Sequence, residues 1–237
     1  MRKNLLPDTD LARIASMPEP HWKPALEKHY DGVPRGSYEP VRSCFCDLFN
    51  ASTPLFDGLP ETPFPYIEKK IRSKTSSPAR IASNISVAKA IHDYVTAKSI
   101  TSRQFEFGKL VLPFNVGMRY WINFVAIVNK RPTVMFIDPR RTNGLNRQGR
   151  QFAFSVMHEF IREQNPDFSD AQLAIMKFTF KKDGNRAARI YIEQEKKLLS
   201  YSEILSNTQE IYRIWDQVIA EKQRAPKKKS GGSGGFI

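Results

Sequence analysis

An acidic residue and four arginines follow two apolar runs in the middle of this chain. The first run, Tyr-Trp-Ile-Asn-Phe-Val-Ala-Ile-Val, begins at Tyr120, and the second, Thr-Val-Met-Phe-Ile-Asp, ends at Asp138. Beyond it stand Arg140, Arg141, Arg147 and Arg150. A guanidinium group matches the geometry of a phosphate, and a helix that begins near Arg147 would add free N–H groups. We therefore expect a strand-end carboxylate beside a phosphate-binding loop.

These residues also have structural interpretations, which the sequence leaves open. Asp138 followed by Pro139 is typical of a turn that closes a strand. The arginines can pair with nearby acids, of which Asp138 and Glu159 are the closest in sequence. Glu159 follows His158, and such a pair usually lies on the solvated face of a helix. Tyr120 and Trp121 could stack on bases, although alternation along a strand would bury at least one of them.

The overall charge is the strongest property of the whole chain. Its 37 lysines and arginines exceed its 24 aspartates and glutamates and give a formal net charge of +13. Such a charge attracts polyanions and makes association salt-sensitive. We expect nucleic acid as the first partner, DNA rather than RNA, with further phosphate contacts from Lys227, Lys228 and Lys229. Solubility alone would also explain the charge, as would an acidic protein partner.

Nothing in the sequence predicts a membrane protein. No run of about 18 apolar residues occurs, and the N-terminus reaches charged residues and Pro7 before the apolar core of a signal peptide could form. We expect a cytoplasmic protein with no membrane partner.

The two cysteines, Cys44 and Cys46, are one residue apart. This spacing is too short for an ordinary disulfide, so none is expected. With His21 and His29 they would supply four zinc ligands, but the spacing matches none of the usual structural-zinc patterns. Buried free thiols are the simpler prediction.

The chain divides into three parts by composition. Residues 1–80 contain ten prolines between Pro18 and Pro78, which leave room for short helices near residues 10–17 and 22–29. Within this part, residues 52–65 keep large apolar side chains and are predicted to form an ordered strap that lies on the core. Residues 81–225 form the predicted core domain, and residues 226–237 form a flexible basic tail whose Gly/Ser stretch has the composition of a linker.

The periodicity of the core predicts a mixed α/β fold, with helices flanking a central mixed sheet. A helical period begins at Ser86, and a capping box at Ser200 and Glu203 opens a long C-terminal helix that runs to about Arg224. Between them the sequence predicts strands at residues 104–107, 110–114, 118–128 and 133–138, a helix at 147–163, and strands at 173–180 and 188–193.

The element order helix, three strands, helix, strand between residues 86 and 180 resembles the PD-(D/E)XK nuclease superfamily. Members of that family, which include restriction enzymes and transposon-end-cutting subunits, hold a divalent metal, usually magnesium, with an acid on the second strand and an acid-x-Lys at the end of the third. By position, Asn123 stands near the first acid, Asp138 at the second and Arg140 at the lysine. Asparagine lacks the negative charge of a strong magnesium ligand. Arginine stays protonated, so it cannot take part in the proton transfers that lysine, with its adjustable pKa, can support. The resemblance therefore implies an αβββαβ nuclease-like core without the full catalytic motif, with a role in mobile elements or defence.

Three functions follow from these observations. The first is a DNA-binding protein without a cofactor, whose arginines and tail lysines contact phosphates. The second is a divergent magnesium-dependent nuclease, with Asp138 as metal ligand and Glu159 or Glu106 as the second acid. The third is a scaffold subunit that binds an acidic protein partner.

Overall fold

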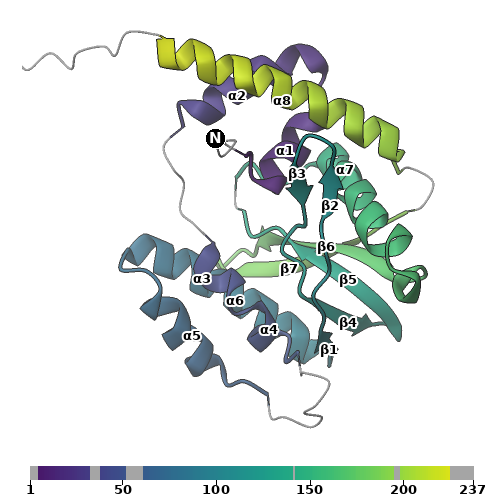
Figure 1. Ribbon diagram of the computed structural model, residues 1–237. Helices are drawn as coiled ribbons and strands as arrows, with labels where there is room; N and C mark the ends of the chain where they lie inside the picture. Colours follow the sequence, from purple (N-terminus) through teal and green to yellow (C-terminus); the bar gives the residue numbers. More distant parts are fainter. Residues whose placement is uncertain (1–4, 33–37, 52–60, 141, 195–197, 225–237) are drawn as a thin grey trace, which may run out of the picture.

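The computed structural model describes residues 5–32, 38–51, 61–140, 142–194 and 198–224 (Figure 1). Within these ranges a five-stranded mixed sheet carries helices on both faces, and a two-stranded hairpin stands beside it. This arrangement confirms the predicted α/β class, with its central mixed sheet, flanking helices and long C-terminal helix. No helix in the described ranges combines the length and the apolar character that crossing a membrane requires.

The sheet has the strand order β1-β4-β5-β6-β7. Its strands are β1 (Thr101–Gln104), β4 (Phe124–Val128), β5 (Arg131–Ile137), β6 (Gln172–Phe180) and β7 (Arg186–Ile192). All neighbours are antiparallel except β5 and β6, which are parallel. A parallel pair needs a long crossover connection. Here the crossover contains α7 (Arg147–Met157), the π-helical segment η2 (His158–Glu163) and the 3-10 turn η3 (Pro166–Phe168).

The two central strands are buried on both faces, which explains their continuous apolar sequences. Along β5, Val134 and Phe136 belong to one hydrophobic core, while Met135 and Ile137 belong to another on the opposite face. The alternation of side chains along a strand thus divides the protein into two cores that share one sheet.

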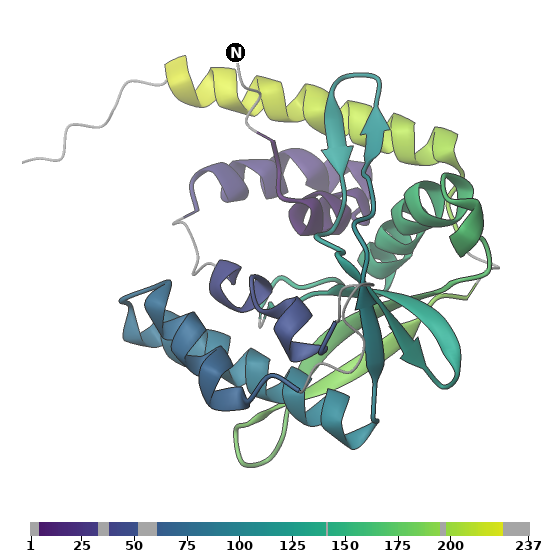
Figure 2. The ribbon, with the colours of Figure 1, turned by 60° about the horizontal axis from the view of Figure 1, so that its bottom comes forward.

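Different parts of the chain cover the two faces, as Figures 1 and 2 show. One face packs against α7 and against α1 (Asp8–Ala15), α2 (Trp22–Tyr30), α8 (Tyr201–Arg224) and the hairpin of β2 (Leu110–Leu112) and β3 (Val116–Met118). The 3-10 turn η1 (Glu19–His21) precedes α2. The other face packs against α3 (Glu39–Arg42), α4 (Phe45–Leu48), α5 (Phe64–Ser73) and α6 (Pro78–Ala97). Residues before 80 therefore contribute to both cores.

The strand predicted at residues 104–107 is found at Thr101–Gln104, and two further differences from the predictions have an identifiable physical cause. Helix α6 begins at Pro78, not at Ser86, because proline is well suited to the first turn, where its missing N–H leaves no bond unmade. The strand predicted at residues 118–128 is interrupted, because Tyr120 and Trp121 have φ angles of 50° and 54°, which no strand accommodates. The capping box at the start of α8 is confirmed: Ser200 Oγ accepts from the Glu203 N–H at 3.3 Å, and Glu203 Oε2 accepts from the Ser200 N–H at 2.8 Å.

Both cysteines are free, with Cys44 buried and Cys46 partly buried. Burial raises the pKa of each thiol above its ordinary value. Residues 52–60 of the predicted strap and the predicted tail at 226–237 lie outside the described residues.

Candidate functional site

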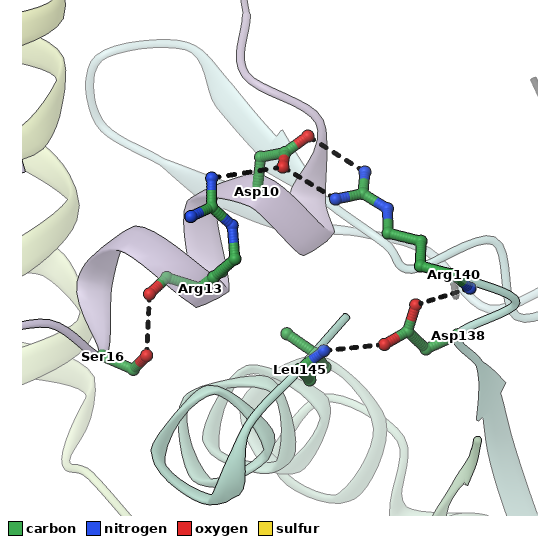
Figure 3. Close-up of polar contacts among 6 residues, drawn as sticks. All are labelled: Asp10, Arg13, Ser16, Asp138, Arg140 and Leu145. Carbon is green, nitrogen blue, oxygen red and sulfur yellow. Dashed lines mark hydrogen bonds and ion pairs between the residues drawn. The ribbon is translucent and has the colours of Figure 1, made fainter. Parts of the chain in front are cut away.

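Asp138 lies immediately after β5, and its side chain is fully buried. One carboxylate oxygen, Oδ2, accepts a hydrogen bond from the Leu145 N–H at 2.8 Å, and Oδ1 accepts from the Arg140 N–H at 3.3 Å (Figure 3). Burial raises the pKa of this carboxyl, although the two N–H donors and the charge of Arg140 oppose the increase. A Cβ placed on Gly144 would stand 2.8 Å from Oδ2, so the loop approaches the carboxylate as closely as glycine permits. Asp138 therefore fastens the loop after β5 to the end of the sheet.

The Arg140 side chain is bound by Asp10 of α1. Its Nη1 and Nη2 atoms donate to Asp10 Oδ1 and Oδ2 at 2.7 and 2.9 Å, a bidentate pair that Arg13 approaches at 3.7 Å (Figure 3). Burial alone would raise the pKa of Asp10, but the hydrogen bonds and charge of Arg140 outweigh it and lower the pKa. This guanidinium joins the loop to the N-terminal helix, and a phosphate would have to displace Asp10 to reach it.

The two arginines of α7 have different surroundings. Arg150 lies with its guanidinium carbon 3.9 Å from the centre of the Tyr191 ring, and its Nη1 donates to the Leu145 carbonyl at 3.5 Å. The Lys177 ammonium of β6 donates to the same carbonyl. Arg147 is exposed at the start of the helix, where Asn146 Oδ1 caps the Gly149 N–H at 2.7 Å. The structure thus places Asp138, Arg140 and Arg150 around one loop, with both guanidinium groups in intramolecular contacts.

The remaining predicted site residues are dispersed or undescribed. Glu159 is half-buried in η2, where burial raises its pKa, and Glu106 is exposed after β1. Asn123 is partly buried, and its side-chain oxygen has no hydrogen-bond partner. Arg141, Lys227, Lys228 and Lys229 lie outside the described residues. In the part of the chain that the structure describes, no three His, Cys, Asp or Glu residues are grouped so that they could hold a metal ion.

A second group of residues was not predicted as a site. Trp121 is 48% exposed, with the guanidinium carbons of Arg42 and Arg119 at 4.1 and 3.7 Å from its ring centre. Its neighbour Tyr120 is 1% exposed, which confirms that only one of these two aromatic residues is available at the surface. Arg42 comes from α3, distant in sequence, so no local pattern indicated the cluster. The exposed tryptophan was the one usable signal.

The protein thus has an α/β fold in which Asp138, Arg140 and Arg150 make contacts within the protein. A separate cluster of Arg42, Arg119 and Trp121 lies at the surface. Residues 9–225 match the family model described as "Sliding clamp-binding bacterial toxin SocB". The chain is also 33% identical over 234 residues to the DNA replication inhibitor toxin SocB of Caulobacter vibrioides (strain NA1000 / CB15N). The matched residues make up 98% of each of the two chains. The chain belongs to the SocB family. No solved structure matches it.

The family corrects two predictions. The resemblance to the PD-(D/E)XK nucleases is wrong, because the matched family is a different one and was found over nearly the whole chain. Element order is a weak basis for such an assignment, since many folds share it. The prediction of a DNA-binding protein with a nuclease-like core, and with it the expected role in mobile elements or defence, is also wrong. The family description specifies a protein, the sliding clamp, as the partner.

Proposed function

We propose that this chain binds the sliding clamp and inhibits DNA replication. The observation that carries the proposal is the similarity, 33% identity across 98% of both chains, to a protein described as a DNA replication inhibitor toxin. The matching family model spans residues 9–225, and therefore every described helix and strand apart from the first residue of α1. The predicted protein-partner function is thus supported over the predicted nucleic-acid function.

Inhibition would follow from occupancy of the clamp. A protein that covers a surface of the clamp excludes other replication proteins that need the same surface. The fraction of clamps that it blocks rises with the ratio of its concentration to its Kd for the clamp. Because replication proteins work in the bacterial cytoplasm, this proposal also places the chain there.

The sequence at residues 52–60 offers a starting point for locating the contact. It contains the adjacent residues Leu55 and Phe56 between Pro54 and Pro60. Large apolar side chains in a short proline-containing segment are suited to anchoring in an apolar groove of a partner, where a few such residues supply most of the affinity. We therefore choose these two residues for substitution.

The direct test measures binding of the purified chain to the purified sliding clamp of Caulobacter vibrioides by calorimetry. We expect a Kd in the micromolar range or tighter, which corresponds to about −8 kcal/mol. The double variant Leu55→Ala/Phe56→Ala should bind at least about tenfold more weakly. The matched control Val111→Ala/Ile127→Ala removes two exposed apolar side chains of β2 and β4 and should bind like the wild type.

A primer-extension assay tests the functional part of the proposal. The chain should slow extension by a clamp-dependent polymerase and leave clamp-independent extension by the same polymerase unchanged. Equal inhibition in both reactions, or no binding to the clamp at a concentration of about 100 μM, would overturn the proposed function.

A further inference from the structure

A cleft of about 1240 Å³ opens beside the exposed tryptophan. Its walls come from the N-terminal residues and α1, from α2, α3 and α6, from the turn after β3, and from the end of β5 with the loop that follows it. Pockets for small molecules usually enclose roughly 300–1,000 Å³. The size of this cleft is therefore better matched by a short stretch of polypeptide than by a metabolite.

Two guanidinium groups in the cleft form no ion pair with any described residue. Arg42 and Arg119 both contact the Trp121 ring, and the carboxylate of Asp8 interacts electrostatically with both without forming an ion pair. Arg42 is partly buried, and burial lowers its pKa; the charges of Glu39 and Asp8 oppose this decrease, and the charge of Arg119 adds to it. Two like charges held close together and partly desolvated attract an anionic ligand more strongly than isolated surface arginines do.

The backbone beneath this cluster is strained. Tyr120 and Trp121 are consecutive aromatic residues in the left-handed region, where bulky side chains are unfavourable. The carboxylate of Asp8 holds the turn by accepting hydrogen bonds from the N–H groups of Arg119 and Tyr120 at 3.3 and 3.0 Å. Strain of this kind is concentrated at ligand-binding positions. Here it keeps the indole of Trp121 at the surface, whereas Trp22 and Trp215 are 6% and 5% exposed.

The other lining residues indicate the class of ligand. The lining contains the cationic side chains of Arg13, Lys28 and Arg80, the carboxylates of Asp8, Asp10 and Glu39, and apolar side chains such as Leu5, Phe45 and Phe136. A track for a phosphate backbone would be lined by one sign of charge. This lining carries both signs of charge. It also contains tryptophan and arginine, which are among the residues that contribute most to affinity in protein–protein interfaces.

We propose that this cleft binds an acidic peptide segment of a protein partner, whose carboxylates pair with Arg42 and Arg119 and whose apolar side chains pack against the exposed edge of Trp121 and the apolar residues of the lining. The site lies apart from residues 52–60 in sequence, and its test requires no sliding clamp. It therefore goes beyond the proposed function and can fail or succeed independently of it.

The test uses a fluorescein-labelled octapeptide of alternating glutamate and leucine, with the peptide of alternating glutamine and leucine as its uncharged match. Binding to the full chain is followed by fluorescence anisotropy. We expect the glutamate peptide to bind at least tenfold more tightly than the glutamine peptide. Arg42→Gln/Arg119→Gln and Trp121→Asn should each weaken binding of the glutamate peptide at least tenfold, and asparagine tolerates the left-handed backbone at position 121.

The control variant Arg131→Gln/Arg147→Gln removes the same charge from two exposed arginines that do not line the cleft, and it should bind within twofold of the wild type. Circular dichroism and thermal unfolding of each variant confirm that it is folded before binding is compared. Equal binding of the two peptides, equal losses in the control and cleft variants, or displacement of the peptide by a 20-base-pair DNA duplex at lower concentration than by unlabelled peptide would overturn the proposal.

Discussion

The loop after β5, which forms one wall of the cleft, and the cluster of Arg42, Arg119 and Trp121 in that cleft use the same residue types in opposite ways. In the loop, the Arg140 guanidinium donates both ends to Asp10, and the Asp138 carboxylate accepts two backbone N–H groups. In the cleft, Arg42 and Arg119 contact an exposed ring and no carboxylate among the described residues. Arginines that are already paired stabilise the fold, and arginines that form no ion pair with a described residue remain available for a ligand. Substitutions in the loop should therefore change stability, and those of Arg42 and Arg119 should change binding.

The largest effect on stability is expected for Asp138→Ala. The variant leaves the Leu145 and Arg140 N–H groups without their acceptor at a buried position, and each such group costs about 1–3 kcal/mol. We expect the free energy of unfolding, measured with urea, to fall by about 3 kcal/mol. A change below about 0.5 kcal/mol would show that Asp138 does not fasten the loop, and would reopen a role for its carboxylate outside the fold.

Asp10→Asn should have the next largest effect, a loss of about 2 kcal/mol at pH 7, because it weakens the pairing of a largely buried guanidinium. The effect should also depend on pH. The folded-state pKa of Asp10 lies below its ordinary value of 3.8, so its contribution is fully present above that value and is lost as the pH falls through the lower folded pKa.

Urea unfolding of the wild type and Asp10→Asn at several pH values between 7 and 3 measures this dependence. The difference between the two proteins should be constant above about pH 5 and should shrink below the ordinary pKa of 3.8. A difference that grows on acidification would have the wrong sign for a stabilising ion pair.

Gly144→Ala should cost about 1–2 kcal/mol, because the new Cβ would overlap Asp138 Oδ2 unless the loop moves. The cost should largely disappear when Asp138 is already alanine. A double-mutant cycle on urea unfolding measures this coupling, and additive effects would mean that the close approach is not what requires glycine.

The smallest effect on stability is expected in the cleft. Arg42→Gln/Arg119→Gln removes no ion pair within the described residues and loses only the contacts of two guanidinium groups with the Trp121 ring, so the free energy of unfolding should fall by about 1 kcal/mol. Thermal unfolding of this variant is also the control for its peptide binding. A loss comparable to that of Asp10→Asn would make the two regions alike and would remove the basis of the comparison.

Much of the fold was predictable because its signals are local. The apolar run that became β5, the helical period of α7 and the capping box of α8 each depend on residues within a few positions of one another. The strand predicted at residues 118–128 failed because a contact from a distant part of the chain outweighed the strand propensity of the local residues. Tyr120 and Trp121 have high strand propensity, but Asp8, more than a hundred residues earlier, binds the backbone N–H groups of this turn.

The candidate site was less predictable, because the ion-pair partner of an arginine cannot be inferred from the distance between residues along the sequence. The nearest acids in sequence to Arg140 were Asp138 and Glu159, yet its partner is Asp10, 130 residues away. The resemblance to a nuclease family failed for a related reason: it depended on the order of elements and on an acid at a strand end, which here serves to hold a loop.

The sequence by itself determined the α/β class, the strongly basic character, the buried central strands and the long C-terminal helix, because composition and periodicity act over short distances. Tertiary structure alone decided which of the described arginines pair with a carboxylate, because that depends on carboxylates brought from other parts of the chain. It also placed Trp121 at the surface between Arg42 and Arg119, where a strained turn held from α1 outweighs the tendency of an indole to be buried.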